Sequence, residues 1–461
     1  MNMINVRRLT VMTFLGAGML SGISAQVSPL QVDTLKETKI PDQWDLQSCI
    51  DYAKEQNITI RKNRITAVST QIDVKTAKAA MFPSLSFSTG QQVVNRPYQE
   101  TSSRVSGSEI ISSNSKTSYN GNYGLNASWT LYNGNKRLKT IQQEKLNNQV
   151  AELDVATSEN SIQESIAQIY IQILYAAESV RVNENTLQVS IAQRDRGQEL
   201  LNAGSIAKSD FAQLEAQVST DRYQLVTAQA TLQDYKLQLK QLLELDGENE
   251  MNIYLPALSD ENVLAPLPTK KDVYIRALSL RPEIEASKLN VEASELGIGI
   301  AKSSYLPTIS LSAGIGTNHT SGSDFTFGEQ VKNGWNNSIG VSVSVPIFNN
   351  RQTKSAVQKA KLQRETSLLS LLDEQKTLYK TIEGLWLDAN SAQQRYAAAN
   401  EKLKSTQISY DLISEQFNLG MKNTVELLTE KNNLLQAQQE QLQAKYMAIP
   451  VSYTHLRAHE T

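Results

Sequence analysis

Four short stretches of this chain alternate between apolar residues and small polar residues. A period of two is typical of a β-strand with one apolar face and one polar face. The stretches form two predicted β-hairpins, at 84–132 and 308–348, whose polar faces consist of Ser, Gly, Asn and Thr. The more apolar face carries Leu85, Phe87 and Thr89, then Tyr123, Leu125, Ala127, Trp129 and Leu131, then Ile309, Leu311, Ala313 and Ile315, and finally Ile339, Val341, Val343, Val345 and Ile347.

After each hairpin the pattern changes to that of a long helix. Residues 136–201 contain no proline, and isoleucines at 162, 166, 169 and 173 follow the three-to-four spacing of a helix face. Residues 351–419 behave in the same way. At about 1.5 Å per residue each stretch predicts a helix of roughly 100 Å. Such a helix must pack sideways against others, and we expect the wall of a tube rather than a solid coiled-coil stalk.

The chain consists of one unit used twice. Pro83 and Pro307 each separate a helical stretch from a strand, and a shift of 224 positions superimposes them together with 53–65 on 277–289. Beyond the first strands the best shift is 216, which aligns 123–135 with 339–351 and 200–217 with 416–433. The second unit is therefore eight residues shorter than the first. The difference falls between two strands, where a surface loop tolerates a change of length. We therefore expect helix, strand, loop, strand, very long helix, tight turn and helix, twice.

These patterns divide the chain into six segments. Arg7 and Arg8, an apolar run and small residues up to Ala25 predict a secretory signal over 1–25, since a membrane anchor needs about 20 apolar residues. No cysteine follows this run, so a lipid-anchored mature end is not expected. The remaining segments are an N-terminal segment at 26–44, a first unit at 45–245 with its turn at 204, a proline-bearing link at 246–271, a second unit at 272–448 with its turn at 420, and a tail at 449–461.

The strands are predicted to face lipid rather than to form a half-buried sheet in a soluble protein. Their polar faces lack Lys and Glu, their loops are long and rich in Ser, Gly and Asn, and aromatic residues lie near the strand ends. Four strands cannot close a barrel, which needs about eight. Several chains must then contribute, and we favour three, with twelve strands. The predicted interfacial aromatics are Phe82, Tyr98, Tyr132, Tyr305, Trp335 and Phe348.

Composition narrows the function classes. A formal net charge of −2 gives no reason to expect a nucleic-acid partner. Cys49 is the only cysteine, so no disulfide can form within the chain. No nucleotide-binding loop, HExxH motif or nucleophile motif is present, and we expect neither an enzyme nor a cofactor or metal site. His319 is expected to be solvated in an outer loop, and His455 and His459 are not expected to bind metal.

Several doubled motifs resemble the TolC family of outer-membrane efflux channels. These are the proline entries at Pro83 and Pro307, the strand exits Leu131–Asn135 and Ile347–Arg351, and turns with an acidic residue six positions after Gly204 and Gly420. The opening Trp44–Asn57 is similar too, and the resemblance covers about Trp44–Ala448. It implies an α+β membrane protein, in which a long α-helical barrel continues into a transmembrane β-barrel of three chains with four strands each.

The resemblance also implies the surroundings of the channel. It implies a homotrimer in the outer membrane that extends into the periplasm, with a belt built from the N-terminal segment and the link. Its tip would dock to a periplasmic adaptor protein and an inner-membrane pump of the RND or ABC type, for multidrug or other small-molecule efflux. Protein secretion and metal-ion efflux use the same scaffold, although no Met or His cluster favours metal. The alternative from another class is a secreted coiled-coil structural protein without a pore.

Two glycine turns are the predicted functional region. The chain is expected to reverse at Gly204 and Gly420 with a positive φ angle, which only glycine adopts without strain. By resemblance, the turns also form the adaptor-docking surface. The tip residues are Ala203, Gly204, Ser205 and Ile206 in the first unit and Leu419, Gly420 and Met421 in the second.

A periplasmic gate is predicted just after these turns. Asp210 and Glu426 lie six residues past the glycines, where a tapering tunnel would bring copies of each carboxylate together. By resemblance, Glu426 matches an aspartate of the closing ring and Lys422 a basic residue that ties the closed state. The second family aspartate falls on Thr429, which implies a single acidic ring. An ordinary charged helix face is the alternative for each residue.

The tail does not fit the repeat. The helix after Gly420 meets Pro450 after 29 residues, whereas the helix after Gly204 is expected to continue to about Leu245. We therefore expect a truncated last helix. The segment 449–461 is interpreted as foreign to the fold, from an expression addition or a sequence-assembly scar.

Overall fold

The computed structural model describes residues 41–98, 102–106, 109–113, 116–246, 251–256, 266–321, 323 and 325–460. The predicted signal peptide, most of the segment 26–44 and part of the link lie outside the described residues. Among the residues that are described, none of the helices is long and apolar enough to cross a membrane.

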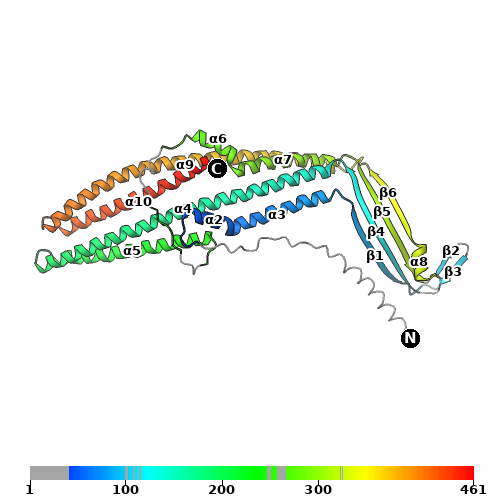
Figure 1. Ribbon diagram of the computed structural model, residues 1–461, viewed down its shortest axis with the longest axis horizontal. Coiled ribbons are helices and arrows are strands. Elements are labelled where there is room, and N and C mark those ends of the chain that lie inside the picture. Colours follow the sequence, from blue (N-terminus) through cyan, green and yellow to red (C-terminus); the bar gives the residue numbers. More distant parts are fainter. Residues whose placement is uncertain are drawn as a thin grey trace, which may run out of the picture. The chain divides into compact units, whose positions relative to one another are not determined.

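Two very long helices carry the fold, as predicted. Helix α4 (Lys136–Asn202) and helix α9 (Gln352–Asn418) have 67 residues each, which corresponds to about 100 Å. Helix α5 (Lys208–Leu242) returns along α4, and helix α10 (Thr424–Glu460) returns along α9, so that each unit contains one long helical hairpin (Figure 1).

The opening helix of each unit is split into pieces of 11 and 22 residues. The first unit has α2 (Leu46–Gln56) and α3 (Ile58–Ala79), and the second has α6 (Lys270–Leu280) and α7 (Pro282–Ser303). Between α2 and α3, the Asn57 side chain accepts hydrogen bonds from the backbone of Thr59 and Ile60 and starts a new helix. In the second unit the break comes from Pro282 at the first position of α7.

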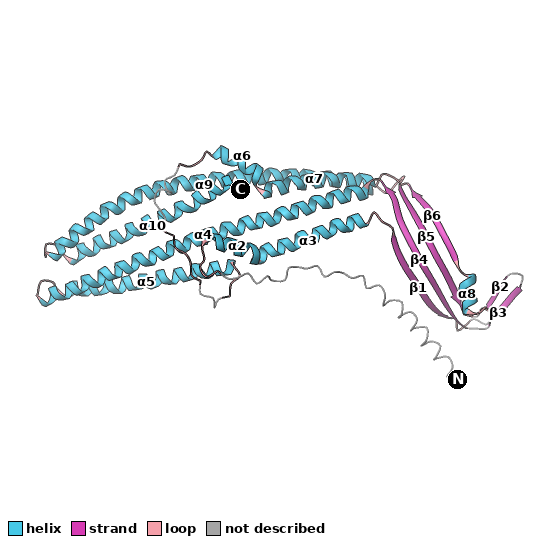
Figure 2. Ribbon diagram, viewed as in Figure 1, coloured by secondary structure: helices cyan, strands magenta, loops and turns pink. Residues whose placement is uncertain are grey.

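The four predicted strands form one antiparallel sheet in the order β1-β4-β5-β6 (Figure 2). They are β1 (Ser84–Asn95), β4 (Thr117–Asn133), β5 (Thr308–Thr320) and β6 (Asn336–Ser344). The register preserves the two predicted faces. Leu85, Ala127, Ala313 and Ile339 lie side by side in one row, and Ser86, Asn126, Gly314 and Ser338 in the next.

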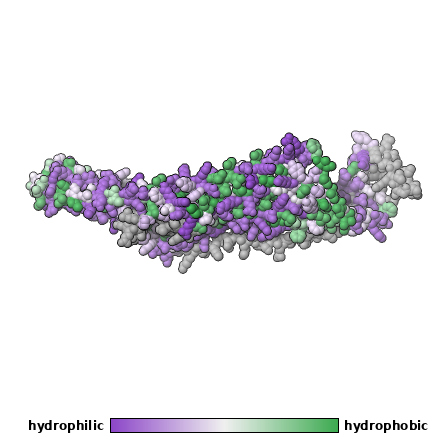
Figure 3. All heavy atoms as spheres, turned by 90° about the horizontal axis from the view of Figure 1, so that it is seen from above, coloured by the Kyte–Doolittle hydropathy of each residue, from purple (hydrophilic) through white to green (hydrophobic). Residues whose placement is uncertain are grey.

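One side of the sheet changes in hydropathy along its length (Figure 3). On the side seen in Figure 3, hydrophobic residues gather where the helices lead into the sheet, and the far end of the sheet is mainly polar. The edges of the sheet are β1 and β6, one from each unit.

The loops between the strands contain regular structure that the sequence analysis did not predict. Strands β2 (Ser102–Ser106) and β3 (Glu109–Ser113) pair with each other, and α8 (Phe327–Asn333) lies between β5 and β6. The start of α8 is a capping box, in which Thr326 accepts from the backbone of Glu329 and Glu329 accepts from the backbone of Thr326. The Thr-x-x-Glu spacing of Thr326 and Glu329 is the local sequence signal for this helix.

Two expectations were wrong. His319 is not a solvated loop residue but belongs to β5, is 8% exposed, and has ring contacts with Tyr119, Tyr123 and Phe327. Helix α10 is not truncated but continues past Pro450 to Glu460, which gives it 37 residues against 35 in α5. A proline inside a helix removes one hydrogen bond and bends the helix without necessarily ending it.

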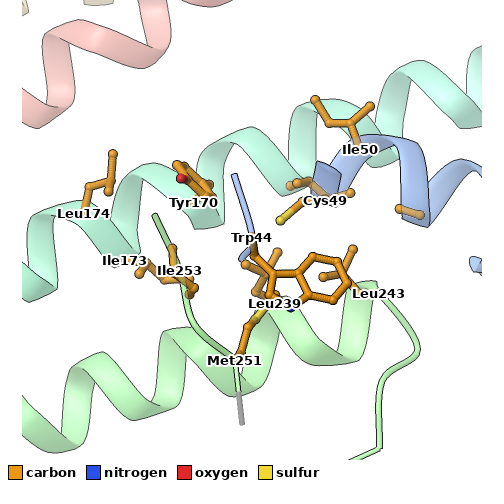
Figure 4. Packing of buried hydrophobic residues seen from close by; sticks show 12 residues of the cluster. Trp44, Cys49, Ile50, Tyr170, Ile173, Leu174, Leu239, Leu243, Met251 and Ile253 are labelled. Atoms are coloured by element: carbon orange, nitrogen blue, oxygen red, sulfur yellow. The ribbon is translucent and has the colours of Figure 1, made fainter. Parts of the chain in front are cut away.

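The largest buried cluster ties the first unit together where α2 meets α4 and α5. Trp44, Cys49 and Ile50 pack against Tyr170 and other residues of these two helices (Figure 4). The backbone of Trp44 pairs with the link, because Trp44 N donates to Asn252 O at 2.8 Å and Tyr254 N donates to Trp44 O at 2.9 Å. The rest of this cluster consists of Ala53, Ile166, Ile173, Leu174, Leu239, Leu243, Met251 and Ile253.

Candidate functional site

The two turns that join the helices of each hairpin have the same geometry. Gly204 and Gly420 have φ angles of 74° and 76°, and a Cβ on either would meet nothing within 4 Å. Ser205 N donates to Leu200 O at 2.8 Å, and Met421 N donates to Gln416 O at 2.9 Å. Each turn is therefore a Schellman motif that satisfies the last carbonyls of a long helix. Glycine is required here for its backbone conformation and not for space.

The predicted gate residues cap the returning helices. Asp210 Oδ2 accepts from the backbone N of Ala207 at 3.4 Å, and Glu426 Oε2 accepts from the backbone N of Asn423 at 3.3 Å. In the second unit, Asn423 Oδ1 also accepts from Glu426 N at 2.9 Å. Each carboxylate is the third residue of its helix, where a negative charge interacts favourably with the positive end of the helix dipole. Helix capping therefore accounts for an acidic residue at both positions without any role in a gate.

Lys422 and Glu426 are brought together as an ion pair. Lys422 Nζ lies 2.9 Å from Glu426 Oε1, one helical turn apart and partly exposed. The hydrogen bond from Lys422, helped by that from the Asn423 backbone, holds the pKa of the Glu426 carboxyl below its usual value of 4.5. The first unit has Ile206 at the position that corresponds to Lys422, so the two turns differ in charge. Thr429 Oγ1 donates to Val425 O at 2.8 Å, within its own helix.

The outer surface of the turns combines polar and apolar groups. Ala203, Gly204 and Ser205 are exposed and Ile206 is partly exposed. Leu419 and Met421 lie close together in the second turn and are 69% and 71% exposed. Two such side chains beside Lys422 and Glu426 make a surface that could contact a protein partner.

At the other end of the helices, the two prolines lie where predicted. Pro83 separates α3 from β1, and Pro307 separates α7 from β5. Trp129 Nε1 donates to Met81 O at 2.8 Å and Arg137 Nη1 donates to Ala80 O at 2.6 Å, so β4 and α4 hold the end of α3. The six predicted interfacial aromatics are all exposed: Phe82, Tyr98, Tyr132, Tyr305, Trp335 and Phe348.

These repeated hairpins and strands match one family model. Residues 49–244 and 273–449 match the model described as outer membrane efflux protein, which is most of the chain. The chain belongs to the outer membrane efflux protein family. It is an outer membrane protein, and the resemblance drawn from the doubled motifs is confirmed.

Individual relatives are distant. The chain is 25% identical over 302 residues to the outer membrane efflux protein BepC of Brucella suis, a match that covers 65% of this chain and 63% of BepC. It is 23% identical to the outer membrane protein TolC of Escherichia coli, with 64% and 61% covered. The matches thus span just under two thirds of the length of these curated relatives.

The fold agrees over a greater length. The structure of the outer membrane protein VceC of Vibrio cholerae aligns with a TM-score of 0.74 at 15% identity, and covers 90% of this chain and 95% of VceC. This likeness shows that the chain shares the fold of VceC over most of its length.

A buried charge cluster lies where α10 of the second hairpin meets α4 and α5 of the first, and the sequence analysis did not predict it. Lys431 of α10 contacts the carboxylate of Asp221 in α5 and the hydroxyl of Ser190 in α4, and the Lys431 and Asp221 side chains are 3% and 2% exposed. Gln217 Nε2 donates to Asp221 Oδ1 at 2.8 Å. Loss of water lowers the pKa of Lys431, although the contact with Asp221 opposes this. Nothing in the one-dimensional pattern separates these residues from exposed charges on the same helices.

Proposed function

We propose that three copies of this chain form a passive outer-membrane channel that exports small molecules delivered by an inner-membrane pump. The observation that carries the proposal is a four-stranded sheet with two free edges, continuous with two helical hairpins of about 100 Å. The proposed role involves transport and no catalysis.

The strand count supports a closed oligomer. Because lipid tolerates no open sheet edge, β6 of one chain must pair with β1 of the next. Three chains supply twelve strands, within the range of outer-membrane barrels. The row that includes Ser86 and Ser338 would line the pore. The neighbouring row with Leu85 and Ile339, which are 70% and 79% exposed, would face lipid.

The helical hairpins support a tunnel through the periplasm. Helices continuous with the strands inherit the circumference of the barrel, so α4, α5, α9 and α10 would form its wall. The turns at Gly204 and Gly420 then lie at the periplasmic tip. The exposed Leu419 and Met421 would dock a periplasmic adaptor, which connects the tunnel to a pump of the RND or ABC type.

The gate is proposed to be an acidic ring at this tip. Three copies of Glu426 would meet where the tunnel tapers, and Asp210 would lie close by in the wall. Fixed carboxylates at a constriction attract cations and repel anions. The ion pair between Lys422 and Glu426 partly neutralises this charge, and its rupture would accompany opening.

The channel is tested by isolating the protein from membranes and reconstituting it in a planar bilayer. We expect a detergent-solubilised particle of three chains, each with the mass that remains of 51.2 kDa once the predicted signal is removed, and discrete conductance steps. The control is a variant with Ile339→Lys on the lipid face, which should assemble poorly in the membrane. Recovery of a folded monomer from the soluble periplasmic fraction, without conductance, would instead support a secreted coiled-coil protein. If the particle conducts, cross-linking at Met421 is the next step, because it identifies the adaptor and thereby the class of pump.

A further inference from the structure

Three of the four strands, β1, β4 and β5, are longer than the membrane requires. Strand β5 has 13 residues, whereas a tilted membrane strand needs about 9–11. On its lipid face the apolar positions end at Ile315, and the next two positions are Thr317 and His319. In β4 the neighbouring positions change in the same way, from Leu125 to Tyr123 and Gly121. The outer headgroup layer is therefore expected beside these last rows.

Helix α8 packs on this end of the sheet, on the same face as Ile315. Thr317 Oγ1 donates to Val331 O at 2.7 Å, and the ring of Phe327 lies 5.0 Å from that of His319. Thr317 and His319 alternate with the pore-facing residues of β5, so their side chains share the lipid face. Helix α8 thus lies on the outside of the sheet and not over the row that would line the pore.

The contact between α8 and the sheet is well defined. His319 is buried beneath Phe327 and between Tyr119 and Tyr123, and neither of its ring nitrogens has a hydrogen-bond partner among the described residues. Gly121 lies directly opposite His319, and a Cβ there would approach His319 Cε1 to 2.1 Å. Glycine therefore leaves the room that the imidazole needs. Helix α8 covers a polar ring that lipid would otherwise contact.

Exposed aromatic side chains lie before and after α8 in the chain. Phe325 and Trp335 flank the helix at 52% and 57% exposure, and Lys332 is exposed within it. Aromatic rings and a lysine at the boundary of an apolar band suit the membrane interface. Glu329 is the one acidic residue of α8, and its carboxylate caps the start of the helix.

We propose that α8 is an interfacial anchor that lies in the headgroup layer of the outer leaflet and leaves the mouth of the pore uncovered. The occupant of its exposed face is the lipid surface. This inference rests on the proposed channel, because that channel defines which face of the sheet meets lipid.

Spin labels on single introduced cysteines test the anchor in lipid vesicles. Gly328→Cys places the probe on α8 where a Cβ meets nothing within 4 Å, so the fold should be kept. Ile339→Cys and Ser338→Cys are matched controls on the lipid face and the pore face of β6. The native Cys49 is buried and should stay unlabelled. Accessibility to oxygen, which concentrates in lipid, is compared with accessibility to a water-soluble nickel chelate.

We expect the oxygen-to-nickel accessibility ratio at Gly328 to exceed that at Ser338 several-fold and to lie below that at Ile339. A ratio at Gly328 equal to that at Ser338, while Ile339 reports lipid, would overturn the anchor and leave the channel intact. Similar, water-like ratios at Ile339 and Ser338 would overturn the channel itself. The three probes therefore separate the two proposals.

Discussion

Lys431 of α10 and Asp221 of α5 form a buried ion pair that joins the two halves of the duplicated chain. The pair is not repeated, because the positions that correspond to Asp221 and Lys431 in the other unit are Ala437 and Glu215. Within one chain, this ion pair adds to other contacts between the hairpins, such as the edge-on rings of Tyr175 and Tyr446. The equivalent contact between neighbouring chains of the proposed trimer would have no such pair.

Removal of one partner of this pair should be strongly destabilising. Lys431→Met leaves the Asp221 carboxylate buried without its cation, and we expect a loss of about 3–5 kcal/mol. The double variant Asp221→Ala with Lys431→Met buries no charge and should regain much of the loss. Thermal unfolding in detergent, followed by circular dichroism, measures both. Equal melting temperatures for the native protein and Lys431→Met would show that the pair contributes nothing.

The acidic ring predicts altered ion selectivity in Glu426→Gln. The substitution keeps the size of the side chain and removes its charge, so cation selectivity in a planar bilayer should fall. Asp210→Asn makes the equivalent change in the first unit, where Ile206 stands in place of Lys422, and so compares the two gate carboxylates. Unchanged selectivity in Glu426→Gln would leave helix capping as the only role of this residue.

Acidification should loosen the second turn. The pKa of Glu426 is lowered in the folded protein, so its contribution to stability is present above the usual value of 4.5 and is lost as the pH falls through the lowered value. Deuterium exchange of the amides at 421–427, corrected for the intrinsic effect of pH, should then accelerate relative to the rest of α10. Glu426→Gln should lack this pH dependence. The same change in both proteins would contradict the assignment to Glu426.

The glycine turns offer a test in which strain alone changes. Gly420→Ala puts a Cβ into open space but at a φ of 76°, which should cost about 1–2 kcal/mol. Gly420→Asn should cost less, because asparagine tolerates this conformation. Limited proteolysis at the turn compares the two variants. Equal cleavage of the alanine variant and the native protein would mean that the turn adopts another conformation.

The fold is predictable from the sequence where a pattern is local and repeated. Periods of two and of three to four residues defined the strands and long helices, and Gly204 and Gly420 fixed both turns. Three-dimensional contacts decided the rest. The sequence did not place His319 correctly, because its burial depends on other elements of the fold. Tyr119 and Tyr123 belong to β4, and Phe327 belongs to α8. The pairing of Asp221 with Lys431 spans 210 positions and leaves no local signal.

Tyr170 and Trp386 allow a final test, of the segments that cross the helices. They correspond to each other in the two units, and each donates to a backbone carbonyl: Tyr170 Oη to Tyr254 O at 2.5 Å, and Trp386 Nε1 to Pro268 O at 3.2 Å. Tyr170→Phe keeps the ring in its cluster and removes only the donor to a partly buried carbonyl, so we expect a loss of about 0.5–1.5 kcal/mol. Tyr223→Phe, on the exposed side of α5, is the control and should have no effect. Thermal unfolding that does not distinguish the two variants would show that the link is held by packing around Trp44 and Ile253 instead.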